Sequence, residues 1–302
     1  MNRFRLLFIL FLFAVSAQAQ LAVRADSIFT SAGPVIRNGV ILIKNGRIEA
    51  IGSGISIPAG YTVMQAKVVT PGLIDARSMV GLSGAYNVPT DQDQIEKSTP
   101  LQPELRAIDA YNPEEKLVEY IRRNGTTTIH TGHGWGALIS GQTMIVKTKS
   151  GLVDDVVIKP LAMIAMTLGP SVSTNFASPG NRSKQVAMLR SELLKAQSAM
   201  KTGAKDTSKV PDLKQAALQQ LLRGEAKALI AANTSNDIMS AIRLAREFNL
   251  KLVLEGAAEA YRLVEQIKQV KAEVIVHATM SRAGGETLNM TMENAALLTK
   301  AG

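Results

Sequence analysis

The last third of the chain alternates short apolar segments with amphipathic ones, and this rhythm limits the fold more than any other feature. We expect strands at residues 228–232, 251–255 and 273–278, and helices at 236–248, 257–270 and 290–300. Strands separated by a helix run parallel, because a tight turn cannot join parallel neighbours. The pattern predicts an α/β fold, best described as a TIM-like (β/α) barrel, with a doubly wound sheet as the alternative.

The middle of the chain continues this rhythm. Strands are expected at residues 68–76, 126–131 and 156–168, and helices at 114–123, 182–201 and 213–223. This gives six or seven barrel strands, whereas a closed barrel of this type has eight. Ala301-Gly302 is a helix-stop signal with no strand after it. We therefore expect a barrel that is incomplete at its C-terminus, or an open fold.

Residues 20–67 have a different character and form short strands. Asn45-Gly46 lies between two strand-sized segments, 40–44 and 47–51, and predicts a two-residue hairpin. We expect a small antiparallel β unit here, followed by the barrel domain over residues 68–302.

The N-terminus has the features of a signal peptide. Arg3 and Arg5 precede an apolar run at residues 6–15, and Ala17-Gln18-Ala19 has the small-residue spacing of a cleavage site. Ten apolar residues are too few for a membrane span, which needs about 20. A buried strand or an anchor is the alternative. We expect residues 1–19 to be removed and the mature chain to be exported to a periplasm or the cell exterior.

Composition excludes several classes of site. The chain has no cysteine, which excludes disulfides and thiolate metal sites, and it has three histidines. The net charge is +9, but the basic residues are scattered and aromatic residues make up 4% of the chain. Nucleic-acid binding is therefore not expected, and no later segment is apolar enough to predict a membrane span.

The most specific stretch, residues 68–76, reads Val-Val-Thr-Pro-Gly-Leu-Ile-Asp-Ala. Before it come an Asn38-Gly39 strand start, the Asn45-Gly46 turn and Ile57-Pro58. This order resembles the amidohydrolase superfamily, in particular its imidazolonepropionase-like branch. The resemblance implies a barrel whose N-terminal β unit is half of a composite β-sandwich. It also implies metal-assisted hydrolysis of C–N bonds in amides or cyclic amides, with a divalent metal such as Zn.

Four further segments, in the same order along the chain, extend the resemblance over most of the mature sequence. Residues 125–128 resemble the second strand of the family, and residues 132–142 its glycine-rich active-site loop. Residues 235–248 resemble the helix after the fifth strand, and residues 253–260 the sixth strand with its turn.

The metal ligands that the resemblance implies are replaced in this chain. The His-x-His pair corresponds to Arg77-Ser78-Met79, and a guanidinium cannot ligate a metal ion. By the same register the remaining ligand positions fall on Ala165, Ala231 and Gly256, and the family's last aspartate would lie beyond residue 302. We predict no metal cofactor. Arg77 and Asn233 are candidates for binding an anionic ligand.

The remaining imidazoles could rebuild a site in another place. His130, His133 and His277 are expected near the same rim, and with a carboxylate such as Glu255 they could hold a relocated metal. The alternative is that these histidines only form hydrogen bonds to loops.

Three functions remain open from the sequence. The first is a degenerate amidohydrolase-like protein that binds a small molecule. The second is an active hydrolase with a non-standard site. The third is a structural protein that pairs with an active paralogue or with itself.

Overall fold

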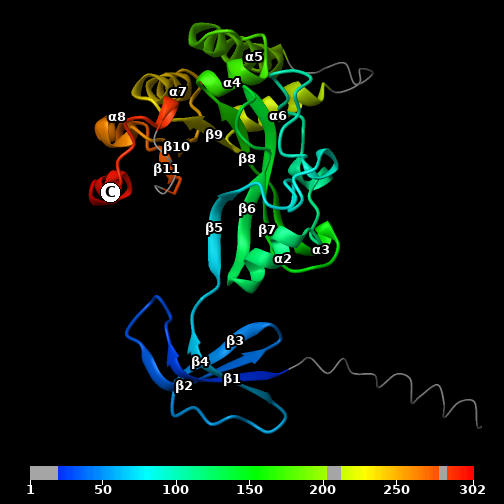
Figure 1. Ribbon diagram of the computed structural model, residues 1–302, viewed down its shortest axis with the longest axis vertical. Coiled ribbons are helices and arrows are strands. Elements are labelled where there is room, and N and C mark those ends of the chain that lie inside the picture. Colours follow the sequence, from blue (N-terminus) through cyan, green and yellow to red (C-terminus); the bar gives the residue numbers. More distant parts are fainter. Residues whose placement is uncertain (1–19, 203–211, 279–283) are drawn as a thin grey trace, which may run out of the picture. The chain divides into compact units, whose positions relative to one another are not determined.

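The computed structural model describes residues 20–202, 212–278 and 284–302. The predicted signal peptide, residues 1–19, lies outside them. The chain divides into two compact units, with the boundary between Gly72 and Leu73 (Figure 1). Within the described residues, no helix has the length and apolar character needed to cross a membrane.

The first unit is a four-stranded sheet in the order β3-β2-β1-β4. The predicted hairpin is confirmed: β2 and β3 pair antiparallel on either side of Asn45 and Gly46, and both turn residues have positive φ angles, 54° and 70°. A wholly antiparallel unit was a wrong expectation, because β4 pairs parallel with β1. The strands are β1 (Leu21–Ile28), β2 (Ile36–Lys44), β3 (Arg47–Ser53) and β4 (Thr62–Val69).

The single strand predicted over residues 68–76 is also wrong. β4 ends at Val69, and β5 begins at Leu73 in the other sheet. Pro71 explains the break, because its backbone has no N–H to give to a sheet and its ring fixes φ. Beyond it, the Leu73 N–H donates to the carbonyl oxygen of Gly125 at 2.8 Å, which starts the second sheet.

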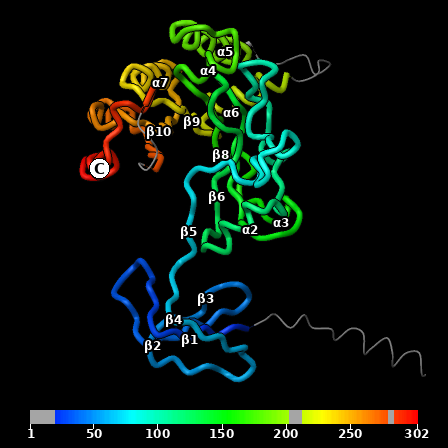
Figure 2. The backbone as a smooth tube through the Cα atoms, in the orientation of Figure 1, coloured from blue at the N-terminus to red at the C-terminus, as the bar shows by residue number. Residues whose placement is uncertain are grey.

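The second unit is built on a seven-stranded sheet in the order β11-β10-β9-β8-β7-β6-β5. The sheet is barrel-like and nearly closed: segments of its two edge strands, β5 and β11, line the same cavity of about 310 Å³. The course of the chain from β5 to the C-terminal segment can be followed in Figure 2. The strands are β5 (Leu73–Ser78), β6 (Thr126–Gly132), β7 (Ile139–Lys147), β8 (Val157–Thr167), β9 (Lys227–Ala232), β10 (Leu252–Gly256) and β11 (Glu273–Val276).

The strand directions follow the connections. β8, β9, β10 and β11 are parallel neighbours, as the strand–helix alternation predicted. β7 runs antiparallel to both β6 and β8, so the sheet is mixed. The predicted glycine-rich loop at residues 132–142 is correspondingly shorter, because Ile139 already lies in β7.

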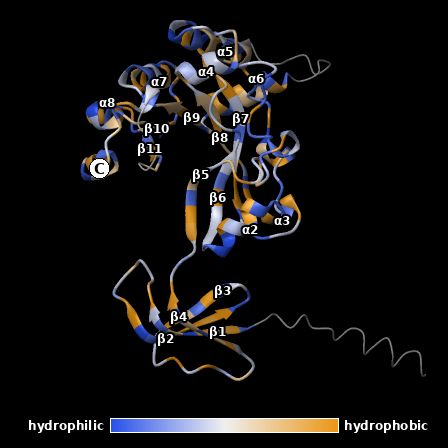
Figure 3. Cartoon of the chain, viewed as in Figure 1, coloured by the Kyte–Doolittle hydropathy of each residue, from blue (hydrophilic) through white to orange (hydrophobic). Residues whose placement is uncertain are grey.

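Helices cover the outer face of β8, β9 and β10. In these strands Ile164, Ile230 and Leu254 point outward into one buried cluster, which also contains Leu193 of α5 and Ile242 of α7. Figure 3 shows hydrophilic and hydrophobic residues alternating along α5 and α7, as expected for helices with one buried face. The helices are α2 (Lys116–Arg123), α3 (Val153–Val156), α4 (Pro170–Asn175), α5 (Arg182–Thr202), α6 (Leu213–Leu222), α7 (Ser235–Phe248), α8 (Val264–Gln269) and α9 (Asn294–Lys300).

Two of the predicted helices are shorter than expected. Residues 257–270 form a 3-10 turn at Ala260–Arg262 and then α8, instead of one helix. Ala257 has a φ of 48°, a left-handed conformation that cannot continue an α-helix. α9 begins at Asn294 and not at residue 290, and the preceding segment carries a further 3-10 turn at Gly285–Thr287. The remaining 3-10 turns are Pro89–Asp91 and Ala107–Asp109.

Candidate functional site

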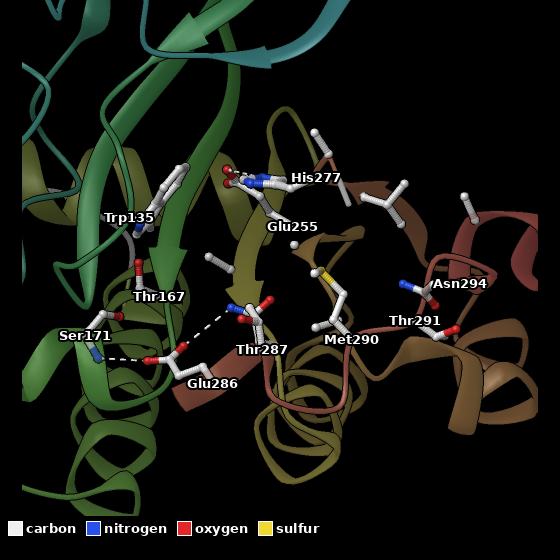
Figure 4. Close-up of a pocket in the computed structure, with 17 residues that line it drawn as sticks. Trp135, Thr167, Ser171, Glu255, His277, Glu286, Thr287, Met290, Thr291 and Asn294 are labelled. Atoms are coloured by element: carbon white, nitrogen blue, oxygen red, sulfur yellow. Dashed lines mark hydrogen bonds and ion pairs between the residues drawn. The ribbon is translucent and has the colours of Figure 1, made fainter. Parts of the chain in front are cut away.

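A cavity of about 220 Å³ lies where β8, β9 and β10 run into their loops (Figure 4). In barrel folds this end of the strands is where binding sites form. The cavity is bounded by these strand ends, by the loop that carries Trp135 and by the segment before α9. Its polar and charged lining includes Thr167, Asn233, Glu255, His277 and Glu286.

A buried ion pair stands at the edge of this cavity. Arg77 Nε lies 3.1 and 3.2 Å from the two carboxylate oxygens of Glu255. The two side chains are 3% and 2% exposed. Arg77 belongs to β5 and Glu255 to β10, which are not neighbours in the sheet. The pair therefore crosses the mouth of the barrel-like sheet.

The guanidinium of Arg77 is held by backbone groups as well. Its Nη1 donates to the carbonyl oxygen of Ser78 at 3.0 Å, and its Nη2 donates to that of His133. The Arg77 backbone N–H donates to Asp75 Oδ1 at 3.0 Å within the last residues of β5, where the pairing with β6 is irregular. An anionic ligand at Arg77 would have to displace Glu255.

The Glu255 carboxylate also contacts His277. Burial opposes ionisation of Glu255, but the hydrogen bond from His277 and the positive charge of Arg77 outweigh it and hold the pKa of Glu255 below its ordinary value. His277 Nε2 lies 3.2 Å from Glu255 Oε1. The His277 ring is tilted by 58° against that of Trp135, with 5.2 Å between the ring centres.

The other two histidines do not line the cavity. His130 Nδ1 donates to the carbonyl oxygen of Ala76 at 2.9 Å, and its Nε2 lies 2.6 Å from Thr143 Oγ1. His133 Nδ1 lies 3.3 Å from the carbonyl oxygen of Gln142. Both side chains are buried. The structure therefore brings His277, but neither His130 nor His133, to the candidate site.

The remaining positions that the resemblance equates with ligands carry no donor suited to a hydrolytic metal ion. Ala231 and Gly256 line the cavity. Ala165 points inward one level lower, in an apolar cluster with Leu229 and Val253. Met79 packs against Gly134, where an added Cβ would lie 2.3 Å from its sulfur.

Asn233 lies at the cavity and shapes its wall. Gly256 has a φ of 77°, and a Cβ added there would lie 2.6 Å from Asn233 Oδ1. A side chain at position 256 would thus be strained and would collide with Asn233.

The sequence pattern did not identify Glu286, Ser171 or Trp135 as parts of a site. Glu286 Oε1 accepts a hydrogen bond from the Ser171 backbone N–H at 3.0 Å, and Oε2 accepts one from Asn233 Nδ2 at 3.4 Å. Figure 4 shows the Glu286 carboxylate joined to Ser171 by a dashed line. Glu286 lies in the 3-10 turn at Gly285–Thr287 with no motif around it, so nothing in the sequence pointed to this contact.

The residues present do not fit a hydrolytic metal centre. Such a centre needs about three protein ligands and an open position for water. Within the ranges that the structure describes, no three His, Asp or Glu side chains are grouped to hold a metal ion. Glu255 is already neutralised by the guanidinium of Arg77.

Comparison with known proteins gives extensive structural matches and a partial sequence match. No family model matches the sequence. The fold superimposes on the crystal structure of an amidohydrolase from Thermotoga maritima MSB8 with a TM-score of 0.87 and 26% sequence identity, over 93% of this chain and 76% of the other.

The sequence match is to a 5-methylthioadenosine/S-adenosylhomocysteine deaminase from Moorella thermoacetica. The identity is 34% over 119 residues, which are 36% of this chain and 28% of the deaminase. The alignment thus spans less than a third of that enzyme.

Proposed function

We propose that the chain, as a member of the amidohydrolase superfamily, is a degenerate representative of the imidazolonepropionase-like branch that binds a small molecule without a metal ion. The observation that supports this proposal is the ion pair between Arg77 and Glu255. Arg77 stands where the resemblance expects the first metal-binding histidine. A fixed positive charge at that point repels a divalent cation and neutralises the carboxylate that could have bound it.

Metal analysis of the purified full-length chain tests this proposal. We expect zinc and manganese far below one ion per chain, and a melting temperature that does not change on addition of a chelator. We also expect no hydrolysis of cyclic amides and no deamination of 5-methylthioadenosine. One tightly bound metal ion per chain together with hydrolysis of an amide would contradict the proposal.

A second candidate function is hydrolysis without a metal, with His277 as general base. One observation favours it: His277 lines the cavity and contacts Glu255, which could orient the imidazole as a carboxylate does in catalytic triads. If the purified chain shows amide hydrolysis, His277→Gln should lower its rate by about 100-fold or more. The matched control is His130→Gln, at a histidine that does not line the cavity, and this variant should retain the rate.

We also propose that the protein is exported after cleavage following Ala19. The charged start, short apolar run and small residues of the N-terminus support this. The intact mass of protein from the native host should correspond to a chain that begins at Gln20. An Ala19→Arg variant should keep its full N-terminus, whereas Gln18→Ala should be cleaved normally. A mature protein that retains residues 1–19 would contradict export by this route.

A further inference from the structure

We infer that the 220 Å³ cavity binds a small organic cation, an amine or guanidine on a compact apolar body, with Glu286 as the counter-ion. This rests on the ligand binding in the proposed function, but it does not depend on whether the protein also holds a metal ion.

The charges around the cavity support a cation. Two carboxylates line it, Glu255 and Glu286, and no lysine or arginine is among its described lining residues. Glu255 is neutralised by Arg77, which does not itself line the cavity. The donors to Glu286 among the described residues are neutral, the Ser171 N–H and the Asn233 amide. Apart from His277, the charged side chains at the cavity, counted with Arg77, therefore sum to one negative charge. Arg182, whose charge also acts on Glu286, does not line the cavity and is paired with Asp237.

The Glu286 carboxylate is also positioned to accept further hydrogen bonds. An ionised carboxylate has about four acceptor sites, and donors among the described residues use two of these. The two existing hydrogen bonds orient the group, so a ligand ammonium would meet a carboxylate that is already fixed in place. A charge-assisted hydrogen bond to such a group is stronger than one between neutral partners.

Trp135 supplies the second recognition element. Its side chain lines the cavity and is 44% exposed, which is unusual for a tryptophan. Trp135 is the one tryptophan of the chain. An indole ring attracts cations and covers apolar ligand surface. Met290 provides a further adaptable apolar contact in the same cavity (Figure 4).

The volume limits the size of the ligand. At about 30 Å³ for each water molecule, 220 Å³ corresponds to roughly seven water molecules. This is below the range of about 300–1,000 Å³ that is usual for sites of drug-sized ligands. The whole chain has a net charge of +9, so its overall field does not attract cations, and selectivity for them must come from the cavity itself.

Trp135 makes the inference directly measurable, because its fluorescence is the tryptophan signal of the whole protein. The full chain is titrated with three probes of one shape: cyclohexylmethylamine, cyclohexylmethanol and cyclohexanecarboxylate. None of them absorbs where tryptophan is excited. We expect a saturable change in fluorescence with the amine, and an affinity for the alcohol and the carboxylate that is about tenfold lower or weaker still.

A variant that removes the charge of Glu286 then tests whether this carboxylate binds the amine. Glu286→Gln keeps a side-chain oxygen for the Ser171 N–H, and it should weaken amine binding about tenfold while leaving alcohol binding unchanged. Glu293→Gln is the matched control, because Glu293 lies in the same segment, is exposed and does not line the cavity. It should bind the amine as the unaltered chain does.

Two results would overturn the inference: equal affinity for amine and alcohol, or a Glu286→Gln variant that binds the amine with unchanged affinity. If that variant does not fold, the comparison of the three probes on the unaltered chain still decides. A protein that binds amines but also holds a metal and hydrolyses amides would refute the proposed function and leave this inference standing.

Discussion

Replacing Arg77 by alanine is expected to lower the free energy of unfolding by about 3–5 kcal/mol. The truncation would leave the Glu255 carboxylate, which is 2% exposed, without the cation that compensates it. It would also remove the guanidinium donors from the backbone oxygens of Ser78 and His133. Chemical denaturation of the unaltered chain and of Arg77→Ala measures the difference directly.

The matched control is Arg190→Ala, which removes a surface ion pair with Glu247. Its partners are 39% and 37% exposed, and such pairs contribute about 1 kcal/mol or less. The double variant Arg77→Met/Glu255→Leu should recover most of the lost stability, because a buried ion pair can often be replaced by apolar side chains without loss. A loss below about 1 kcal/mol for Arg77→Ala would show that the pair is not buried as described.

The strand–helix alternation of the C-terminal third was predictable because each element has start and stop signals in its own local sequence. The helix α7 is an example: Thr234 caps its start by accepting a hydrogen bond from the Asp237 N–H, and Asn249 ends it in a left-handed conformation. The parallel order of β8 to β11 then follows from the helical crossovers.

The antiparallel strand β7 could not be derived in the same way. Residues 139–142 were expected to be the end of a glycine-rich loop, and the buried pattern of residues 139–147 matches that of any core strand. Strand direction is set here by pairing partners on both sides, which local sequence does not encode.

The same limit explains what the sequence revealed of the site. The family register placed Arg77 at the mouth of the barrel, and Glu255 was named only as a partner for histidines. Their ion pair joins residues 178 positions apart. It depends on the curvature of the sheet, which brings β5 and β10 together. Likewise, no local signal connects Glu286 with Ser171, which lies 115 positions earlier.

The stability of the protein is expected to fall by about 3 kcal/mol between pH 7 and pH 4 through His130 alone. Burial lowers the pKa of His130 to about 4, whereas an unfolded histidine has a pKa of about 6.5. As the pH falls below 6.5, His130 is protonated in the unfolded chain but stays neutral in the folded chain, so protonation favours unfolding. The stabilisation is fully present above pH 6.5 and is lost progressively down to the folded pKa. A difference of about 2.5 pKa units corresponds to about 3 kcal/mol.

The dependence is measured by denaturation at intervals between pH 7 and pH 4, for the unaltered chain and for His130→Gln. Glutamine can donate to the carbonyl oxygen of Ala76 as His130 does, but it does not titrate, so the variant should lose most of the slope that His130 contributes. Some slope should remain, because burial lowers the pKa of His133 as well. If His130→Gln kept the full slope, His130 would have to take up its proton in the folded protein. An imidazolium would then sit beside the guanidinium of Arg77, and the buried arrangement at the barrel mouth would be wrong.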